Sequence, residues 1–260
     1  MSGLITIKKH APSGTLILNR PEKRNALSRA LLTDFQQALF DLHQEKDVRA
    51  IILTGSGSAF CTGMDLKEIY ETMQQEDPQQ QWYEDAILYK DLLETMLRFP
   101  KPIIAAVNGP ALASGAGLVL AADLVVAGST AQFGLPEPRR GIVAGLIAPL
   151  LNFRVGGATA ARLLFTAEPI PASEAARLGL FHELVDDEVV WAQAHEMAKA
   201  CALSAPESLQ LTKRLLNETI GEQLGTMLSA GAAASATART TEAAAEGVAA
   251  FLEKRPPVWP

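Results

Sequence analysis

Residues 101–117 read KPIIAAVNGPALASGAG, and this stretch decides the fold class. Its first half, Ile103–Val107, is a continuous apolar run, which is typical of a short strand buried on both faces. Asn108-Gly109-Pro110 then predicts a turn, and the small residues after it predict the start of a buried helix. A buried strand that leads through a turn into a helix is the unit from which α/β folds with parallel strands are built.

Further strands are predicted on both sides of this unit. Ala50–Thr54 and Leu124–Ala127 are apolar runs of the same kind, whereas Leu4–Lys8 and Thr15–Leu18 predict a β-hairpin near the start of the chain. Helical patterns alternate with the runs, and the clearest begins after Ser28, a favourable N-cap residue. The chain is therefore expected to fold as an α/β protein with a parallel core.

Two helical stretches complete the prediction. Between the first two buried strands, a polar break at Glu76–Gln81 separates two segments, and the second repeats apolar residues at helical spacing from Trp82 to Met96. From about Ala205 the chain is predicted to be helical, with Leu209, Leu216 and Ile220 along one side. The alanine-rich Ala230–Ala245 is expected to form a helix. Its small side chains require close packing on another surface, which another subunit could provide.

Composition excludes several classes of function. The 260 residues carry a net charge of −6 and no basic tract, which argues against nucleic acid as a partner. The uncharged stretch Pro102–Ala122 is long enough for a membrane span, but its prolines, glycines and polar residues favour a strand, a turn and a helix. Cys61 and Cys201 are expected to be reduced thiols, and no Cys/His spacing indicates a metal site. Without a secretory signal near the start, the chain is expected to be cytoplasmic.

Two glycine-containing segments have the composition of a binding site for a carbonyl oxygen. They are residues 59–68, which follow a predicted strand, and residues 101–117. Small residues let a ligand approach the backbone closely, and the first N–H groups of a helix have no partner within the helix. Such groups suit an oxygen that becomes negatively charged during a reaction.

Together the segments resemble the enoyl-CoA hydratase/isomerase (crotonase) superfamily. The similarity continues through Asn19-Arg20-Pro21 with Asn25-Ala26-Leu27, and through residues 131–137, 172–180 and 246–256. The resemblance implies an α/β fold, namely a crotonase-like spiral of ββα turns with a C-terminal helical region. Residues 1–200 would form the core that binds acyl-CoA and residues 201–260 a helical oligomerisation region. A homotrimer or hexamer is implied.

The resemblance also implies a set of site residues. The thioester oxygen would accept hydrogen bonds from the backbone N–H groups of Met64 and of Ser114 or Gly115. Coenzyme A would enter as part of the substrate, with no separate cofactor, and would lie along two loops and a C-terminal lysine. These CoA-binding positions are Lys23, Asn25, Ala26, Leu27, Ala59, Phe60, Thr62, Asp65 and Lys254.

One departure from the family pattern bears on the reaction. Hydratases of the family use two glutamates, and only the second is present here, as Glu137. The first position is Gly117, which cannot exchange a proton. Leu146 also stands where many members have glycine. A single carboxylate with an oxyanion hole is sufficient to shift a proton along an acyl chain, so we expect an enoyl-CoA isomerase with Glu137 as its catalytic residue. An enoyl-CoA hydratase, a thioester hydrolase and a catalytically silent acyl-CoA-binding protein are the alternatives.

Overall fold

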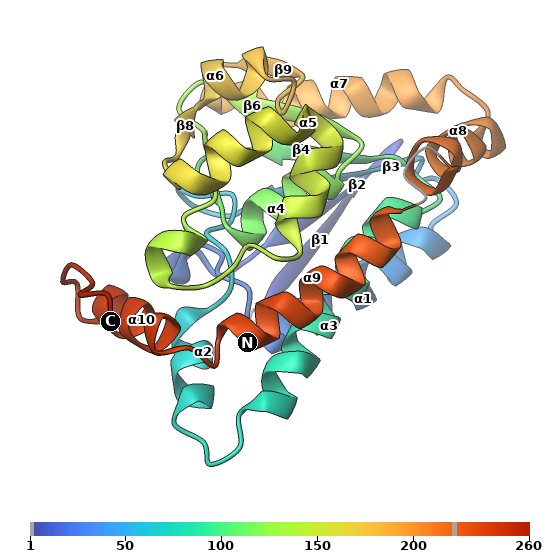
Figure 1. The fold of residues 1–260 in the computed structure, drawn as a ribbon. Helices are drawn as coiled ribbons and strands as arrows, with labels where there is room; N and C mark the ends of the chain where they lie inside the picture. The colour runs from blue at the N-terminus through green and yellow to red at the C-terminus, as the bar shows by residue number, and fades with distance from the viewer. Residues whose placement is uncertain (1–2, 220–222) are drawn as a thin grey trace.

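A six-stranded sheet forms the centre of the computed structural model, which describes residues 3–219 and 223–260 (Figure 1). Its strand order is β1-β2-β3-β4-β6-β9. Only β1 and β2 pair in antiparallel fashion, and the other neighbours are parallel. The strands are β1 (Ile5–His10), β2 (Ser13–Leu18), β3 (Ala50–Gly55), β4 (Ile103–Val107), β6 (Leu124–Gly128) and β9 (Glu183–Val185).

A second, smaller sheet turns the chain into a spiral. Its order is β5-β7-β8, with bounds Ala111–Leu112, Gln132–Gly134 and Ile170–Pro171. Strand β4 is followed by β5 and a helix, and β6 is followed by β7 and a helix, so successive turns place one strand in each sheet. This succession is the spiral of strand, strand and helix that the sequence predicts.

The central strands are buried on both faces. Ile52, Ile104 and Val126 pack against helix α7 (Val190–Ala202) on one face. The alternate residues, such as Ile51 and Leu53, belong to the main core on the other face. Because both faces are covered, residues 50–53 of β3 and all residues of β4 are apolar, and this produces the continuous runs seen in the sequence.

Helices surround both sheets and form the C-terminal region. Besides α7, the described helices are α1 (Arg29–Gln44), α2 (Leu66–Met73), α3 (Gln79–Arg98), α4 (Ser114–Ala121), α5 (Ile147–Thr166), α6 (Ala172–Arg177), α8 (Pro206–Arg214), α9 (Leu224–Ala238) and α10 (Glu242–Leu252). In Figure 1, α9 runs diagonally across the molecule and α10 lies beside α2. A 3-10 turn, η2 (Glu137–Arg140), precedes α5.

Several predicted elements are confirmed. The β-hairpin forms, and the Ser28 hydroxyl caps α1 by accepting a hydrogen bond from the Leu31 N–H (3.2 Å). The stretch Pro102–Ala122 comprises β4, β5 and α4, and no helix in the described part of the chain is long and apolar enough to cross a membrane. Both cysteines are free thiols.

Two predicted boundaries were wrong. The residues Gln79–Gln81 form the first turn of α3, so the polar break is limited to the residues before it. The alanine-rich segment is divided into α9 and α10, because the Thr241 hydroxyl accepts a hydrogen bond from the Ala244 N–H (3.1 Å) and starts a new helix there. The predicted apolar position Ile220 lies outside the described residues.

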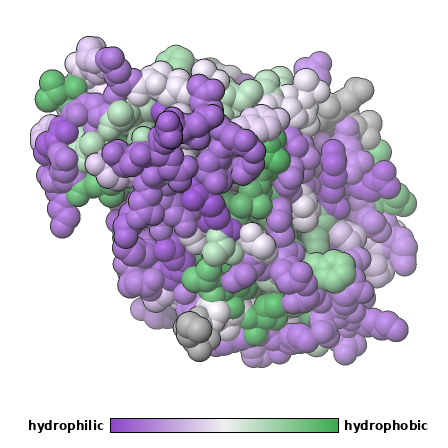
Figure 2. Space-filling model, turned by 90° about the horizontal axis from the view of Figure 1, so that it is seen from below, coloured by the Kyte–Doolittle hydropathy of each residue, from purple (hydrophilic) through white to green (hydrophobic). Residues whose placement is uncertain are grey.

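The small residues of α9 pack against the same chain. Helix α9 contacts α3 and α5, and a Cβ on Gly231 would lie 2.7 Å from the carbonyl carbon of Gly145. The close packing that these small side chains require is thus provided by α3 and α5 of the same subunit. Seen from below, the surface is mostly hydrophilic, with apolar residues in separate patches (Figure 2). The role of residues 201–260 in oligomerisation stays a prediction.

Candidate active site

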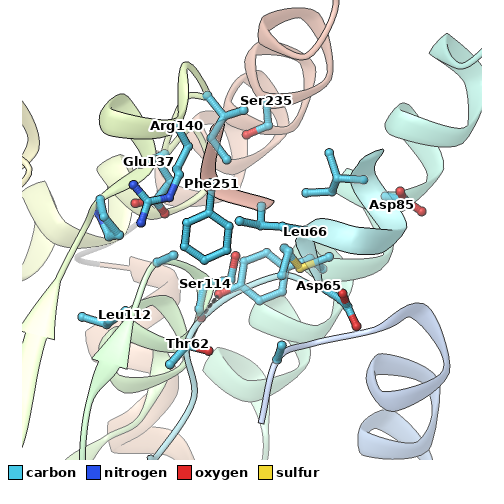
Figure 3. A pocket seen from close by; sticks show the side chains of 18 of the residues that line it. Thr62, Asp65, Leu66, Asp85, Leu112, Ser114, Glu137, Arg140, Ser235 and Phe251 are labelled. Atoms are coloured by element: carbon cyan, nitrogen blue, oxygen red, sulfur yellow. Dashed lines mark hydrogen bonds between the residues drawn. The ribbon is translucent and has the colours of Figure 1, made fainter. Parts of the chain in front are cut away.

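A cavity of about 410 Å³ opens between the N-terminal loops, the start of α4 and the two C-terminal helices. Its walls come from residues 22–24 and 26, from the stretch between Thr62 and Ile69, from the middle of α3, from residues 112–114, from the segment between Pro136 and Ile147, and from the C-terminal helices α9 and α10. Figure 3 shows Glu137 and Ser114 in this cavity, with the Phe251 ring beside them and Asp85 farther away. The elements predicted to carry chemistry therefore meet at one place.

The two glycine-containing segments lie side by side in this cavity. Cys61 and Ala111 form a parallel bridge, and the Leu112 N–H donates to the Cys61 carbonyl oxygen (2.9 Å). One step further along, a Cβ on Gly63 would lie 2.6 Å from the Ala113 Cβ. Position 63 therefore requires glycine, because any larger side chain would collide with Ala113.

The backbone of Met64 presents its N–H on the side away from the core. The Leu27 N–H donates to the Gly63 carbonyl oxygen (2.8 Å), and the Asp65 N–H donates to the Leu27 carbonyl oxygen (2.9 Å). In a parallel bridge the residues on either side of the bridged one make the bonds. The N–H of Met64 itself is therefore directed away from Leu27, and Met64 lines the cavity.

Ser114 presents the second candidate N–H group. It is the first residue of α4, and its nitrogen lies only 3.4 Å from the position of a Cβ on Gly63. Ala113 before it has φ 52° and ψ −128°, a conformation that costs a non-glycine residue about 1–3 kcal/mol. The start of α4 thus lies beside Gly63, the residue before Met64.

Gly115, the alternative donor, does not line the cavity. A Cβ on Gly115 would lie 2.8 Å from the Cys61 Cβ, so its hydrogen allows α4 to pack on the Cys61 segment. The structure assigns Gly115 to packing and leaves Met64 and Ser114 as the pair that faces the cavity.

Glu137 lies in the cavity with its carboxylate buried. The side chain is 5% exposed, and in the described part of the chain neither carboxylate oxygen has a hydrogen-bond partner. Burial raises its pKa from 4.5 to about 7, although the backbone N–H of Glu137 itself and the positive charge of Arg140 act in the opposite direction. A carboxyl group with this pKa accepts and returns protons readily near neutral pH.

The space beside Gly117 is filled by Tyr89. A Cβ on Gly117 would collide with the Tyr89 hydroxyl, which donates a hydrogen bond of 2.5 Å to the Ser114 carbonyl oxygen. Burial raises the pKa of this phenol, so it stays protonated. The position of the missing glutamate is thus occupied by a neutral hydroxyl group from α3.

The other carboxylates of the cavity are paired or exposed. Asp65 accepts a hydrogen bond from the Arg20 guanidinium (2.9 Å), Asp85 is bound by Arg29 through two hydrogen bonds, and Glu22 is exposed. Glu137 is therefore the cavity's unpaired buried carboxylate. In the described part of the chain, no group of three or more His, Cys, Asp or Glu side chains could hold a metal ion.

The structure divides the predicted CoA-binding residues into two groups. Four of them line the cavity, namely Lys23, Ala26, Thr62 and Asp65. Four others are fully buried and do not line it, namely Asn25, Leu27, Ala59 and Phe60. These four side chains are packed inside the loops, and their part in CoA binding stays a prediction.

Asn25 shows how this packing works. Its side-chain amide donates to the carbonyl oxygens of Ser56 (2.9 Å), Ala59 (2.8 Å) and Phe60 (3.2 Å), and its own carbonyl accepts from the Arg20 N–H (3.0 Å). It thereby fixes the first loop against the second. A motif position of this kind reflects loop structure.

Several cavity residues were missed by the sequence analysis. Arg24 and Lys67 add cations near Lys23 at the exposed edge. The guanidinium of Arg140 lies over the Phe251 ring, 4.4 Å from its centre, and joins α10 to η2. Lys254 follows α10 rather than belonging to it, with φ 55°, and does not line the cavity. Arg24 directly follows Lys23, and this pair of basic residues was the available signal for Arg24.

Comparisons with known proteins agree with this geometry. The family model described as enoyl-CoA hydratase/isomerase matches residues 14–260. A protein from Thermus thermophilus named "Putative enoyl-CoA hydratase" is 40% identical over 93% of this chain and 95% of its own length. The "2,3-dehydroadipyl-CoA hydratase" of Escherichia coli is 34% identical over 93% of this chain and 92% of its own length.

Solved structures confirm the fold. An enoyl-CoA hydratase/isomerase from Xanthobacter autotrophicus superposes with a TM-score of 0.85 at 31% identity, covering 97% of this chain and 93% of the other. The expected crotonase-like spiral is therefore confirmed. The chain belongs to the enoyl-CoA hydratase/isomerase family.

Proposed function

We propose that this enzyme shifts a double bond in an enoyl-CoA by moving a proton between two carbons of the acyl chain. Glu137, as carboxylate, removes a proton from Cα of a 3-enoyl-CoA. The negative charge that develops on the thioester oxygen is stabilised by the N–H groups of Met64 and Ser114. Glu137, now protonated, returns the proton to Cγ, which yields the 2-enoyl isomer and restores the carboxylate.

The observation that carries this proposal is the isolation of Glu137. It is buried without a hydrogen-bond partner in the described chain, and the place of a second acid is filled by the Tyr89 hydroxyl. Addition of water requires that a water molecule be held and activated while a proton is delivered to Cα. One carboxylate suffices for proton transfer within the substrate, so isomerisation fits the residues better.

Hydration of a 2-enoyl-CoA is the second candidate. It is favoured by the names of the relatives, several of which are hydratases. In that case Glu137 alone would manage both the water and the proton. We place it second because Gly117 and Tyr89 supply no second base.

The binding of coenzyme A is proposed for the exposed edge of the cavity. Lys23, Arg24 and Lys67 lie there, and their charges suit phosphate groups. Lys254 remains a candidate for the same phosphates. The cytoplasmic location and the homotrimer or hexamer also stay predictions.

A direct comparison of substrates tests the reaction. We expect the wild-type enzyme to convert a 3-enoyl-CoA with a kcat/KM ~10²–10⁴-fold above that for hydration of crotonyl-CoA, because hydration lacks one acid–base group. Products are identified by chromatography and mass spectrometry. Faster hydration than isomerisation would reverse the order of the two candidates. Release of free CoA would indicate a hydrolase, and binding without turnover a silent acyl-CoA-binding protein.

The pKa of Glu137 predicts the pH dependence of isomerisation. Since the reaction starts from the carboxylate, the rate should rise with pH, reach half of its plateau at about pH 7, and fall tenfold per pH unit well below that. The plateau is reached above pH 7, where Glu137 is deprotonated. The measurement is kcat/KM for a 3-enoyl-CoA between pH 5 and pH 9, and a flat profile would contradict a base with a raised pKa.

A further inference from the structure

The far side of the cavity contains a buried cation whose hydrogen-bond donors are unfilled in the described part of the chain. Arg239, at the end of α9, lines the cavity and is 9% exposed. In the described part of the chain its guanidinium donates no hydrogen bond, and Nη1 is buried without a partner. A buried arginine normally has its donors filled by carboxylates or carbonyl groups.

The nearest carboxylate is already occupied. Asp85 accepts hydrogen bonds from Arg29 Nε (2.6 Å) and Nη2 (2.8 Å), and from Gln81 (2.9 Å). Arg239 Nη1 lies 3.8 Å from Asp85 Oδ2, which is beyond hydrogen-bond distance. Asp85 thus provides Arg239 with charge attraction only.

Arg29 interacts with more carboxylates than Arg239 does. Two arginines share the single carboxylate of Asp85, and burial and the neighbouring Arg29 both lower the pKa of Arg239. The Glu68 carboxylate accepts a hydrogen bond from the backbone N–H of Arg29 (3.0 Å). An additional anion beside Arg239 would fill its vacant hydrogen-bond donors.

One polar side chain accompanies Arg239 on the same wall. Ser235 lies one helical turn before it on α9, lines the cavity and is also buried. Its hydroxyl donates a hydrogen bond to the Val143 carbonyl oxygen (3.5 Å). In Figure 3, Asp85 lies across the cavity from Glu137, and Ser235 lies between them.

We propose that Arg239 binds a carboxylate at the end of the substrate's acyl chain, so that the substrate class is an ω-carboxyacyl-CoA. The proposal rests on the proposed function, because the thioester must lie at Met64 and Ser114. Tyr89 and Asp85 are one turn apart on α3, about 6 Å along its axis. An acyl chain that starts beside Tyr89 therefore needs to be only a few carbons long to approach Arg239.

The test compares the binding of two saturated thioesters that cannot react. Adipyl-CoA and hexanoyl-CoA both have six-carbon acyl groups, and they differ in whether the far end is a carboxylate or a methyl group. Calorimetry should show that the wild-type enzyme binds adipyl-CoA about 10- to 100-fold more tightly, the range expected for hydrogen bonds to a charged group. Equal affinities, or tighter binding of hexanoyl-CoA, would overturn the proposal.

Variants assign the preference to Arg239. Arg239→Met keeps the length and apolar stem of the side chain and should abolish the preference, whereas Arg239→Lys keeps the charge and should retain part of it. Arg214→Met, on the exposed side of α8, is the matched control and should leave the preference intact. Persistence of the wild-type preference in Arg239→Met would overturn the assignment even if Arg239→Lys folds poorly.

The same experiment separates failure of this proposal from failure of the proposed function. If neither thioester binds, the acyl-CoA site itself is misplaced. If both bind equally and a 3-enoyl-CoA is isomerised, only the carboxylate subsite is wrong. If adipyl-CoA is preferred and no 3-enoyl-CoA is isomerised, the proposed carboxylate subsite is supported and the proposed isomerisation is wrong.

Discussion

Replacing Glu137 with glutamine is expected to lower kcat/KM for a 3-enoyl-CoA by ~10²–10⁴-fold, the usual contribution of a general acid–base group. Glutamine has nearly the same shape but cannot take up the Cα proton. The carboxylate makes no hydrogen bond within the described chain, so its replacement breaks no structural contact there. Binding of a saturated acyl-CoA should therefore stay close to the wild-type value, and calorimetry measures it.

A matched control distinguishes this effect from the loss of a negative charge. Glu188→Gln changes an exposed carboxylate on the 3-10 turn before α7 and should leave turnover unchanged. Full activity of Glu137→Gln would show that Glu137 takes no part in the reaction. A loss of CoA binding in Glu137→Gln would assign the residue to binding instead.

Introducing glutamate at position 117 is expected to damage the fold rather than create a hydratase. The new Cβ would collide with the Tyr89 hydroxyl and would lie 3.3 Å from the Ile147 side chain. Overpacking of a filled core costs about 1–3 kcal/mol, and burial of an unpaired carboxyl group adds to this. Tyr89 also holds the Ser114 carbonyl, so its displacement should shift the candidate oxyanion site and lower isomerisation by about 100-fold.

Urea unfolding and kinetics on the same variant measure both effects. Gly225→Glu is the control, because a Cβ on Gly225 meets nothing within 4 Å and the residue lies in helix α9. In a Tyr89→Phe background the blocking oxygen is absent, so Gly117→Ala should cost less stability than it does beside Tyr89. A stable Gly117→Glu variant with increased hydration would show that the tyrosine does not exclude a second acid.

The central strands and the small-residue turn could be predicted from the sequence because their causes are local. A strand buried on both faces must be apolar at every position, as Ile103–Val107 is, and a chain that passes close to another backbone needs glycine, as at Gly63. The position of Glu137 followed from the family pattern. These features depend on a few neighbouring residues.

The remaining features depend on contacts between distant segments. Nothing near Gly117 indicates that Tyr89, 28 residues earlier, fills its vacant space, since this depends on the orientation of α3. Arg239 lies within an alanine-rich segment, and only the break before α10 places it in the cavity. Conversely, Asn25 and Phe60 belong to the motif yet support its loops from inside.

The buried state of Glu137 also links the folding equilibrium to the proton concentration. Its pKa is 4.5 when solvated and about 7 in the fold, so folding takes up a proton between these two pH values. Because the folded chain then binds more protons than the unfolded chain, the contribution of this residue to stability falls as pH rises through that window. At about 1.4 kcal/mol per pKa unit, the difference amounts to about 3 kcal/mol. The carboxylate form that acts as a base is thus the form that the fold tolerates least, and packing elsewhere in the chain offsets its cost.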